Sequence, residues 1–116
     1  SELKGGNLHC VHILCTLIME RQLEFEWDEE KRQQTLKERG IDILYAALIF
    51  EGKTLTRIDD RRDYGEERLI SLGVVDGEAF IVVHTEREGV IRLITAWKGG
   101  RRDRDYYQKS IAGRLA

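Results

Sequence analysis

Apolar residues recur at every second position in the first clear element of this chain. Leu23, Phe25 and Trp27 alternate with acidic residues, which is typical of a strand with one buried face. Further along, four stretches of apolar and β-branched residues are also expected to be strands: 54–59, 68–75, 80–86 and 90–98. The pattern therefore predicts a short N-terminal strand and, later in the chain, a small sheet of about four strands.

Two helices are predicted between the N-terminal strand and the sheet. Asp28 is a good N-cap for the first helix, and Gly40 is a residue type that commonly ends a helix. Asp42 can cap the second helix, from Ile43 to Phe50. Because this second segment is apolar nearly all round, we expect it to be buried.

A third helix, polar and C-terminal, is predicted from about Arg101 to Ser110, after the pair Gly99-Gly100. With 116 residues, the chain can bury one core but has no room for a separate cofactor domain. The expected fold is α+β. An N-terminal strand and two helices would pack on a small antiparallel sheet of about four strands, and a C-terminal helix would follow.

Two expected hairpin turns, Asp76-Gly77 and Glu88-Gly89, set a register for three of the strands. One face would carry three rows: Leu72/Ile81/Ala96, Ile70/Val83/Ile94 and Arg68/Thr85/Arg92. The opposite face would carry three others: Gly73/Phe80/Trp97, Ser71/Val82/Thr95 and Leu69/His84/Leu93. The first face is apolar except for its last row, so we expect the buried helices to cover it.

Residues 1–18 are expected to be an extension of a domain that spans residues 19–116. Leu8 to Met19 is an apolar run of about a dozen residues, too short to span a bilayer. It lacks the cleavage pattern of a signal peptide. The extension either lies upstream of a natural start at Met19 or adds a strand or helix that covers an edge or forms a dimer contact. No membrane association is predicted.

Charge is distributed unevenly, although the formal net charge is only −2. Residues 20–30 carry a local balance of −5, whereas residues 97–116 carry +4. This asymmetry indicates an anionic partner for one face, but two solvated helices of opposite charge would give the same pattern.

The two cysteines, Cys10 and Cys15, form no disulfide framework and fit a reducing cytoplasm. With His9 and His12 nearby, zinc binding is conceivable, yet ligands so close together in an apolar run are more often incidental. No nucleotide-binding glycine motif or acidic cluster with metal-ligand spacing occurs in the sequence. The sequence therefore predicts neither a metal nor a cofactor.

Arginines are expected to converge at one end of the sheet. In the predicted last row, Arg68 and Arg92 flank Thr85, and Arg87 lies one step beyond. Guanidinium groups match the geometry of phosphate, so this end is a candidate phosphate site. A structural ion-pair network is the alternative, with three nearby carboxylates as partners: Glu66, Glu67 and Glu86.

One histidine and several aromatic residues add to this candidate chemistry. Imidazole is the side chain best suited to move protons near neutral pH, but His84 lies between two leucines and could equally be a core residue. Trp97, Tyr106 and Tyr107 could stack on bases, although aromatic residues more often make core contacts. Both interpretations stay open for each of these residues.

Many short motifs, in the same order, resemble the BrnT family of bacterial ribonuclease toxins. They are Phe25-Glu26-Trp27-Asp28-Glu29-Glu30-Lys31, Lys37-Glu38-Arg39-Gly40-Ile41-Asp42, Ala46-Ala47-Leu48-Ile49-Phe50, Asp63-Tyr64-Gly65-Glu66-Glu67-Arg68, Leu72-Gly73, His84-Thr85-Glu86-Arg87, Ile91-Arg92-Leu93-Ile94-Thr95-Ala96 and Arg101-Arg102-Asp103-Arg104. The resemblance covers about residues 23–107. It implies a RelE-like fold, translation arrest by RNA cleavage, and neutralisation by a BrnA antitoxin whose DNA-binding domain lets the complex repress its own operon.

Cleavage of RNA without a metal needs a base for the 2′-hydroxyl, an acid for the leaving 5′-oxygen, and cations for the charge on phosphorus. The candidates for this chemistry are His84, Arg68, Arg92 and Lys98. His84 would move protons, and the three cations would hold and stabilise phosphate. The candidates for RNA binding are Arg62, Tyr64, Arg87, Arg101 and Arg102.

The predicted function is that of a metal-independent endoribonuclease toxin with RNA as substrate and a BrnA-like antitoxin as partner. Operator DNA would be contacted only through the antitoxin, and both a homodimer and a heterotetramer with the antitoxin are compatible with the sequence. The family tends to show Ser-Ala-Arg-Lys near the last strand, where this chain has Thr95-Ala96-Trp97-Lys98. This departure keeps a second function open: a degenerate toxin that binds protein or nucleic acid without cutting.

Overall fold

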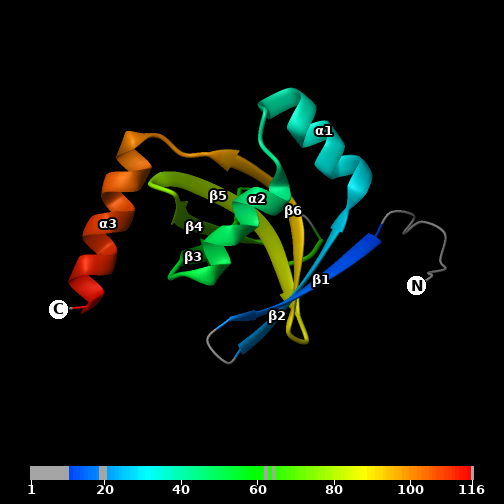
Figure 1. Ribbon diagram of the computed structural model, residues 1–116, viewed down its shortest axis with the longest axis horizontal. Coiled ribbons are helices and arrows are strands. Elements are labelled where there is room, and N and C mark those ends of the chain that lie inside the picture. The colour runs from blue at the N-terminus through cyan, green and yellow to red at the C-terminus, as the bar shows by residue number, and fades with distance from the viewer. Residues whose placement is uncertain (1–10, 19–20, 62, 64, 116) are drawn as a thin grey trace.

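A mixed six-stranded sheet forms the centre of the protein, with helices packed on it (Figure 1). The computed structural model describes residues 11–18, 21–61, 63 and 65–115. The strands are β1 (Val11–Ile18), β2 (Arg21–Asp28), β3 (Leu55–Ile58), β4 (Leu69–Val75), β5 (Glu78–Arg87) and β6 (Val90–Lys98). The helices are α1 (Glu29–Arg39), α2 (Ile43–Ala46), the 3-10 helix η2 (Ala47–Glu51) and α3 (Arg101–Leu115). The predicted α+β class is therefore confirmed.

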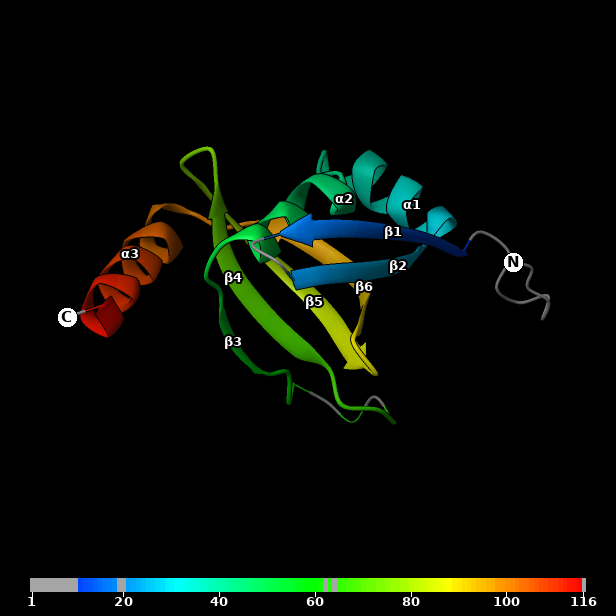
Figure 2. The ribbon, with the colours of Figure 1, turned by 60° about the horizontal axis from the view of Figure 1, so that its bottom comes forward.

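The strands are ordered β1-β2-β6-β5-β4-β3 across the sheet. β2 pairs with β6 in parallel, and the other neighbours are antiparallel. The prediction of an antiparallel sheet of about four strands was wrong, because β2 joins the sheet and β1 pairs with it as an edge strand. Parallel strands need a long connection between them. Here the connection from β2 to β6 consists of the helical segment followed by β3, β4 and β5. Figure 2 shows β1 and β2 side by side, with α3 apart from α1 and α2.

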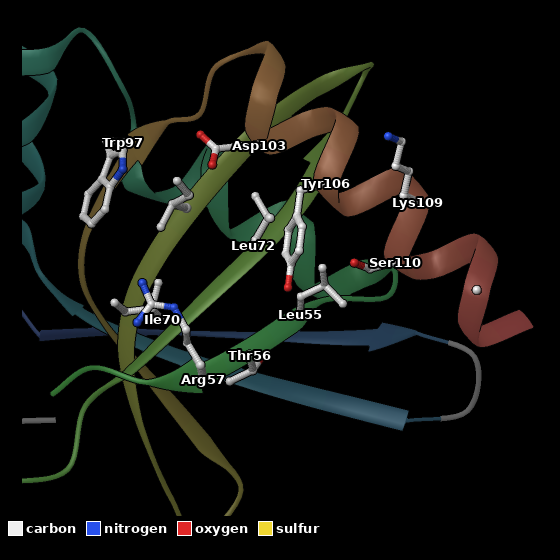
Figure 3. A pocket seen from close by; sticks show the side chains of 12 residues that line it. Leu55, Thr56, Arg57, Ile70, Leu72, Trp97, Asp103, Tyr106, Lys109 and Ser110 are labelled. Carbon is white, nitrogen blue, oxygen red and sulfur yellow. The ribbon is translucent and has the colours of Figure 1, made fainter.

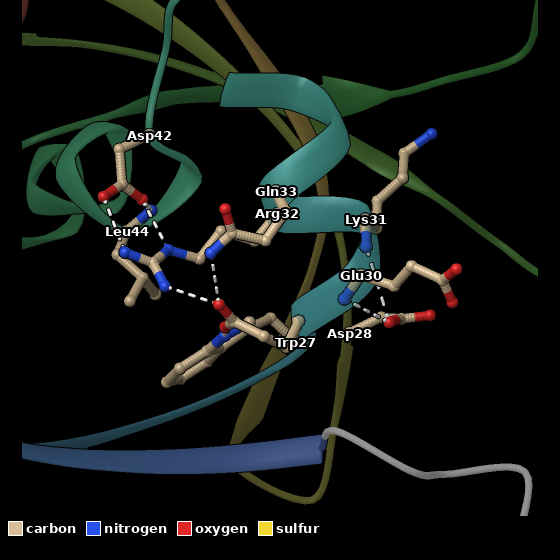
Figure 4. Close-up of polar contacts among 9 residues, drawn as sticks. Trp27, Asp28, Glu30, Lys31, Arg32, Gln33, Asp42 and Leu44 are labelled. Atoms are coloured by element: carbon tan, nitrogen blue, oxygen red, sulfur yellow. Dashed lines mark hydrogen bonds and ion pairs between the residues drawn. The ribbon is translucent and has the colours of Figure 1, made fainter. Parts of the chain in front are cut away.

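The first predicted helix is confirmed, with both of its ends. The Asp28 carboxylate caps α1 by accepting from the backbone N–H of Glu30 at 2.9 Å (Figure 4). Gly40 ends the helix in the left-handed conformation at φ 69°. Arg32 then joins the two helical segments, because its guanidinium donates to both oxygens of Asp42 at 2.9 and 3.0 Å and to Glu29 at 2.8 Å. The bonds from Arg32 lower the pKa of Asp42.

The second predicted helix is split in two. Only Ile43–Ala46 is α-helical, and the chain then tightens into the 3-10 helix η2. Their apolar side chains are buried against the sheet, as the pattern predicted: Ile43, Ala46, Ala47, Ile49 and Phe50. Ile49 approaches the sheet so closely that a Cβ placed on Gly73 would lie 2.5 Å from the Cβ of Ile49. A glycine in mid-strand is therefore required for η2 to sit where it does.

Both predicted hairpin turns are confirmed, with Asp76, Gly77, Glu88 and Gly89 all at positive φ. The β4–β5 register is also as predicted, from Leu69 opposite His84 onward. The β5–β6 register holds only from Arg87 opposite Val90 to His84 opposite Leu93. Beyond that point a β-bulge shifts the pairing by one residue, so four predicted rows were wrong in their β6 member. Ile81 lies opposite Trp97 and Val83 opposite Thr95, where Ala96 and Ile94 were expected; Phe80 lies opposite Lys98 and Val82 opposite Ala96, where Trp97 and Thr95 were expected.

The helices cover the face of the sheet that we did not expect. The core joins α2 and η2 to Phe80, Val82 and Leu93, which share a face with His84. We call this the helix-covered face, and we call the opposite one the outer face. The outer face carries Leu55, Arg57, Ile70, Leu72, Ile81, Val83, Thr85, Arg92, Thr95 and Trp97. Both faces carry enough apolar residues to be buried, and on the covered face Ser71 Oγ is bonded to His84 Nε2 and to Thr56 Oγ1.

α3 is longer than predicted and lies beside one end of the outer face. It contacts β4 and β5, and two hydrogen bonds anchor it. The Tyr107 hydroxyl donates to the carbonyl of Lys53 at 2.6 Å, and the Arg104 guanidinium donates to the carbonyl of Gly77 at 3.2 Å. The outer face is thus flanked by a helix at one end, and no helix of the described residues lies over its other end.

Candidate functional site

A charged cleft of about 370 Å³ lies at the end of the outer face that is remote from α3. Its lining residues are Glu26, Glu66, Thr85, Arg87, Glu88, Val90 and Arg92. The strand pairings bring them together: Glu26 of β2 lies beside Arg92 of β6, which lies opposite Thr85 of β5. We call this hollow the charged cleft.

Carboxylates and guanidinium groups are interleaved around the charged cleft. Arg92 Nη1 donates to Glu26 Oε1 at 2.8 Å, with both side chains partly exposed. Arg68 Nε lies 3.3 Å from Glu66 Oε2, so Arg68 is linked to the cleft through one of its lining residues. Arg87 is exposed and makes no ion pair within the described part of the chain. Three of the predicted cations therefore gather at this end of the sheet, two of them in ion pairs.

The other predicted cations lie elsewhere. Lys98 is at the opposite end of β6, on the helix-covered side, where its Nζ lies 3.0 Å from Glu78 Oε2. Lys98 comes six positions after Arg92 in the strand, which corresponds to a distance of about 20 Å. Arg101 and Arg102 begin α3 at that same end and are exposed. The structure therefore does not bring Lys98 together with Arg68 and Arg92, because the length of β6 lies between them. The predictions for Arg62 and Tyr64 fall outside the described residues.

His84 is fully buried on the helix-covered face. Its Nε2 lies 2.7 Å from Ser71 Oγ, and its ring packs edge-on against Phe50 at 5.0 Å. Burial lowers the pKa of His84 to about 4, so the imidazole is neutral at physiological pH. In this position it cannot touch a substrate on the outer face. This position agrees with the interpretation of His84 as a core residue. It does not agree with direct proton transfer from His84 to RNA.

A chain of hydroxyl groups connects His84 to the edge of the sheet. Ser71 Oγ lies 2.7 Å from Thr56 Oγ1 as well as 2.7 Å from His84 Nε2. These contacts cross three neighbouring strands, from β5 through β4 to the short edge strand β3. Arg57 follows Thr56 in β3 and belongs to the outer face. His84 thus helps to hold the strand that carries an outer-face cation.

A second hollow, of about 540 Å³, lies between the outer face and α3 (Figure 3). We call it the apolar groove. Its floor is formed by four aliphatic side chains: Leu55, Ile70, Leu72 and Ile81. Trp97 lies on one side of it and Tyr106 of α3 on the other. The guanidinium carbons of Arg39 and Arg61 lie 5.5 and 5.7 Å from the centre of the Trp97 ring.

The comparison with known families gives a match over most of this fold. The model for the BrnT ribonuclease toxin of type II toxin–antitoxin systems matches residues 27–103. The chain belongs to the BrnT family. A search of curated proteins gives no significant match. The match begins at Trp27 in β2 and ends at Asp103 in α3, so it includes all the cleft residues except Glu26, which directly precedes it.

Trp97, the residue at which the sequence departs from the motif expected of the family, has a defined place in the fold. Trp97 is in the wall of the apolar groove, and two arginines pack on its ring. Arg39 also donates to the carbonyl of Ala96 at 3.1 Å, and Arg61 is held by both oxygens of the buried Asp59 at 2.7 Å. Positive charge is therefore present around Trp97, supplied by arginines from neighbouring elements.

Sequence reasoning missed two residues that the fold brings to the outer face. Arg57 could have been found, because alternation in the predicted strand 54–59 puts it on one face with Leu55; its place opposite Ile70 is set by the pairing of β3 with β4, which no tight turn specifies. Glu26 could not, because its neighbour Arg92 is set by parallel pairing of β2 with β6, which no turn specifies. Its acidic neighbours in the sequence suggested only a solvated face.

Within the described residues, no group of three or more His, Cys, Asp or Glu side chains is placed to hold a metal ion. His9 and Cys10 fall outside the described residues, as do the side chains of His12 and Cys15. Among the helices described, none is long and apolar enough to cross a membrane.

Proposed function

We propose that this protein is an endoribonuclease toxin that cleaves RNA at the charged cleft without a metal ion. Its membership of the BrnT ribonuclease-toxin family is the observation that carries the proposal. The cleft supports the location, since it gathers arginines and carboxylates from three strands and two loops in one hollow on the sheet. Phosphodiester cleavage needs these two kinds of group, one to stabilise charge and one to accept a proton.

The proposed chemistry is attack of the 2′-oxygen of a ribose on the adjacent phosphorus. Glu26 takes the proton of the 2′-hydroxyl, and its contact with Arg92 at 2.8 Å holds the carboxylate in place. The remaining N–H groups of Arg92, together with Arg87, stabilise the negative charge that builds on the phosphoryl oxygens. The 5′-oxygen leaves with a proton from water, so the products carry a 2′,3′-cyclic phosphate and a 5′-hydroxyl.

The other candidates have supporting parts in this proposal. Arg68 orients Glu66 at the rim of the cleft, at a contact of 3.3 Å. Arg101 and Arg102 hold the RNA backbone at a distance from the cleavage site, and Lys98 lies near them. Arg62 and Tyr64 stay predicted RNA contacts. His84 is a positioning residue that acts through Ser71 and Thr56.

The cellular part of the proposal follows from the toxin–antitoxin family. RNA cleavage in the cytoplasm would arrest translation, and a BrnA-like antitoxin with a DNA-binding domain would neutralise the toxin and bring the complex to its operator. The antitoxin would be a separate chain.

The test is incubation of the purified protein with total RNA in EDTA, followed by analysis of the product ends. Glu26→Gln and Arg92→Ala should each lower the cleavage rate by at least 100-fold, because they remove the proposed base and a charge-stabilising group. Glu24→Gln is the matched control, since it removes the same charge two residues away on the same face of β2. Intact RNA with folded wild-type protein, or equal activity in all the variants, would reject the mechanism.

A non-catalytic binding module is the second candidate. Two observations favour it: Arg68 and Arg92 are already in ion pairs, and the histidine of the predicted chemistry is buried. This function predicts that the wild-type protein binds RNA or protein and leaves RNA intact in the same assay.

A further inference from the structure

The apolar groove is a second built feature of the outer face. Its volume of about 540 Å³ is in the range of ligand-binding pockets, and its floor consists of aliphatic side chains. Tyr106 in its wall is 63% exposed, the largest exposure among the exposed large apolar residues of the described chain. Exposed apolar surface that is hollowed and rimmed by polar groups marks a binding site.

The chemistry of the floor favours protein over nucleic acid. Bases bind mainly by stacking on flat aromatic or guanidinium surfaces, whereas Leu55, Leu72 and Ile81 offer branched aliphatic groups. The Trp97 ring is already packed against the guanidinium groups of Arg39 and Arg61. Aliphatic side chains of another protein are the better match to such a floor.

The rim of the groove adds a preference for negative charge. Arg57 and Lys109 line the groove, with Arg39 and Arg61 beside Trp97. Asp103 is the one acidic lining residue, and its carboxylate already accepts from the backbone N–H of Gly100 at 3.0 Å. A partner with acidic side chains beside its apolar ones would be complementary to this rim.

We propose that the apolar groove binds a segment of the partner antitoxin that presents apolar side chains to the sheet and acidic side chains to the rim. The proposal rests on the proposed function, since it takes the chain to be the toxin of a toxin–antitoxin pair. Trp97 and Arg92 are five residues apart on the outer face, which corresponds to about 16 Å. A protein chain docked in the groove therefore extends readily over the charged cleft, so docking and inhibition share one face.

The experiment uses the purified product of the small open reading frame adjacent to that of the toxin. Its binding to the full toxin chain is measured by isothermal titration calorimetry for the wild type, Leu72→Glu and Tyr106→Ala. Leu72→Glu, which puts a charge on the groove floor, should weaken binding by at least 100-fold, and Tyr106→Ala by about tenfold. Leu48→Glu is the matched control, because Leu48 is 38% exposed on η2, which packs on the opposite, helix-covered face of the sheet. It should change the affinity by less than twofold.

Two further measurements keep the outcomes separate. Circular dichroism reports folding, and Tyr106→Ala decides the matter if Leu72→Glu does not fold. RNA cleavage is followed in parallel: folded Leu72→Glu should cleave like the wild type but resist inhibition by the adjacent gene product. If the wild type cleaves no RNA, the proposed function fails while the calorimetry still decides the groove.

Three results would overturn the assignment of the groove. The first is wild-type affinity in both folded groove variants. The second is no binding of the adjacent gene product to the wild-type toxin. The third is a loss of affinity in these variants for a single-stranded RNA oligonucleotide in place of the protein, which would assign the groove to RNA.

Discussion

At the residue scale, His84 lies in the core with one ring nitrogen bonded to Ser71 and the other without a hydrogen-bond partner in the described part of the chain. Glu86 Oε2 lies 3.5 Å from this second nitrogen, too far for a good hydrogen bond and next to an imidazole that burial keeps neutral. An unbonded buried polar atom costs about 1–3 kcal/mol. The link through Ser71 to Thr56, which joins three strands, offsets part of that cost.

Burial of His84 should make the protein less stable at acid pH. Its pKa is about 4 when folded, against its ordinary value of 6.5 when unfolded, so between these values the unfolded chain binds more protons. The free energy of unfolding should therefore fall as the pH falls from 7 to 4, with His84 contributing about 3 kcal/mol of the loss. Urea unfolding at pH 7 and pH 4 tests this against His84→Gln. The variant should lose less stability over that range; an equal loss in both proteins would refute it.

Sequence alone could place His84 in a strand between two leucines, but it could not decide its role. The pattern gives the face on which a residue lies, whereas burial depends on which face the helices cover. Both faces here are largely apolar, with Ile70, Ile81 and Val83 on one and Phe80 and Val82 on the other. The choice is made by contacts between elements that are far apart in the sequence, such as that of Ile49 with Gly73.

At the element scale, the short helix η2 depends on a glycine in the strand beneath it. A Cβ at Gly73 would lie 2.5 Å from Ile49 Cβ and 2.9 Å from Ile49 Cγ2. Ile49 is 1% exposed and packs in the core, and close-packed cores resist such displacement. The pair Leu72-Gly73 in the sequence is thus explained by packing between η2 and β4.

Gly73→Ala should therefore destabilise the fold by about 1–3 kcal/mol, since η2 must shift to relieve the overlap. Gly113→Ala in α3 is the control, because an added Cβ there meets nothing within 4 Å and should stabilise the helix by about 0.5–1 kcal/mol. Denaturant unfolding of both variants measures the two changes. A Gly73→Ala protein as stable as the wild type would show that η2 is more adaptable than this packing indicates.

The sequence could predict elements whose signals are local. The caps at Asp28 and Gly40 and the turn at Asp76-Gly77 depend on chemistry within a few residues, and all three are confirmed. The bulge between Val83 and His84 and the parallel pairing of β2 could not be predicted in this way, because neither has a turn that specifies it. The charged cleft depends on the parallel pairing, which brings Glu26 beside Arg92, whereas the bulge places Trp97 opposite Ile81 beside the apolar groove. For this reason its arginines were expected, while Glu26 was not.

At the scale of the whole molecule, the outer face combines two kinds of surface. The charged cleft lies at one end and the apolar groove at the other, next to the basic start of α3. The net charge of −2 conceals this arrangement, because acidic residues are concentrated in residues 20–30. An RNA strand held at the cleft would meet cations at α3 only several nucleotides away. The helix should therefore affect RNA binding and leave the chemical step unchanged.

This separation gives a prediction for the double variant Arg101→Ala/Arg102→Ala. Each lost phosphate contact should lower the slope of log affinity against log salt concentration by about 0.7 for single-stranded RNA, so the double variant should lose about 1.4. The cleavage rate at saturating RNA should stay within about twofold, because the cleft is about 20 Å away along β6. Fluorescence anisotropy at several salt concentrations gives the slope.

Lys31→Ala/Lys37→Ala on α1 removes the same charge from exposed positions and should leave the slope unchanged. Equal slopes in the two double variants would mean that only overall charge matters and that α3 does not hold the RNA backbone.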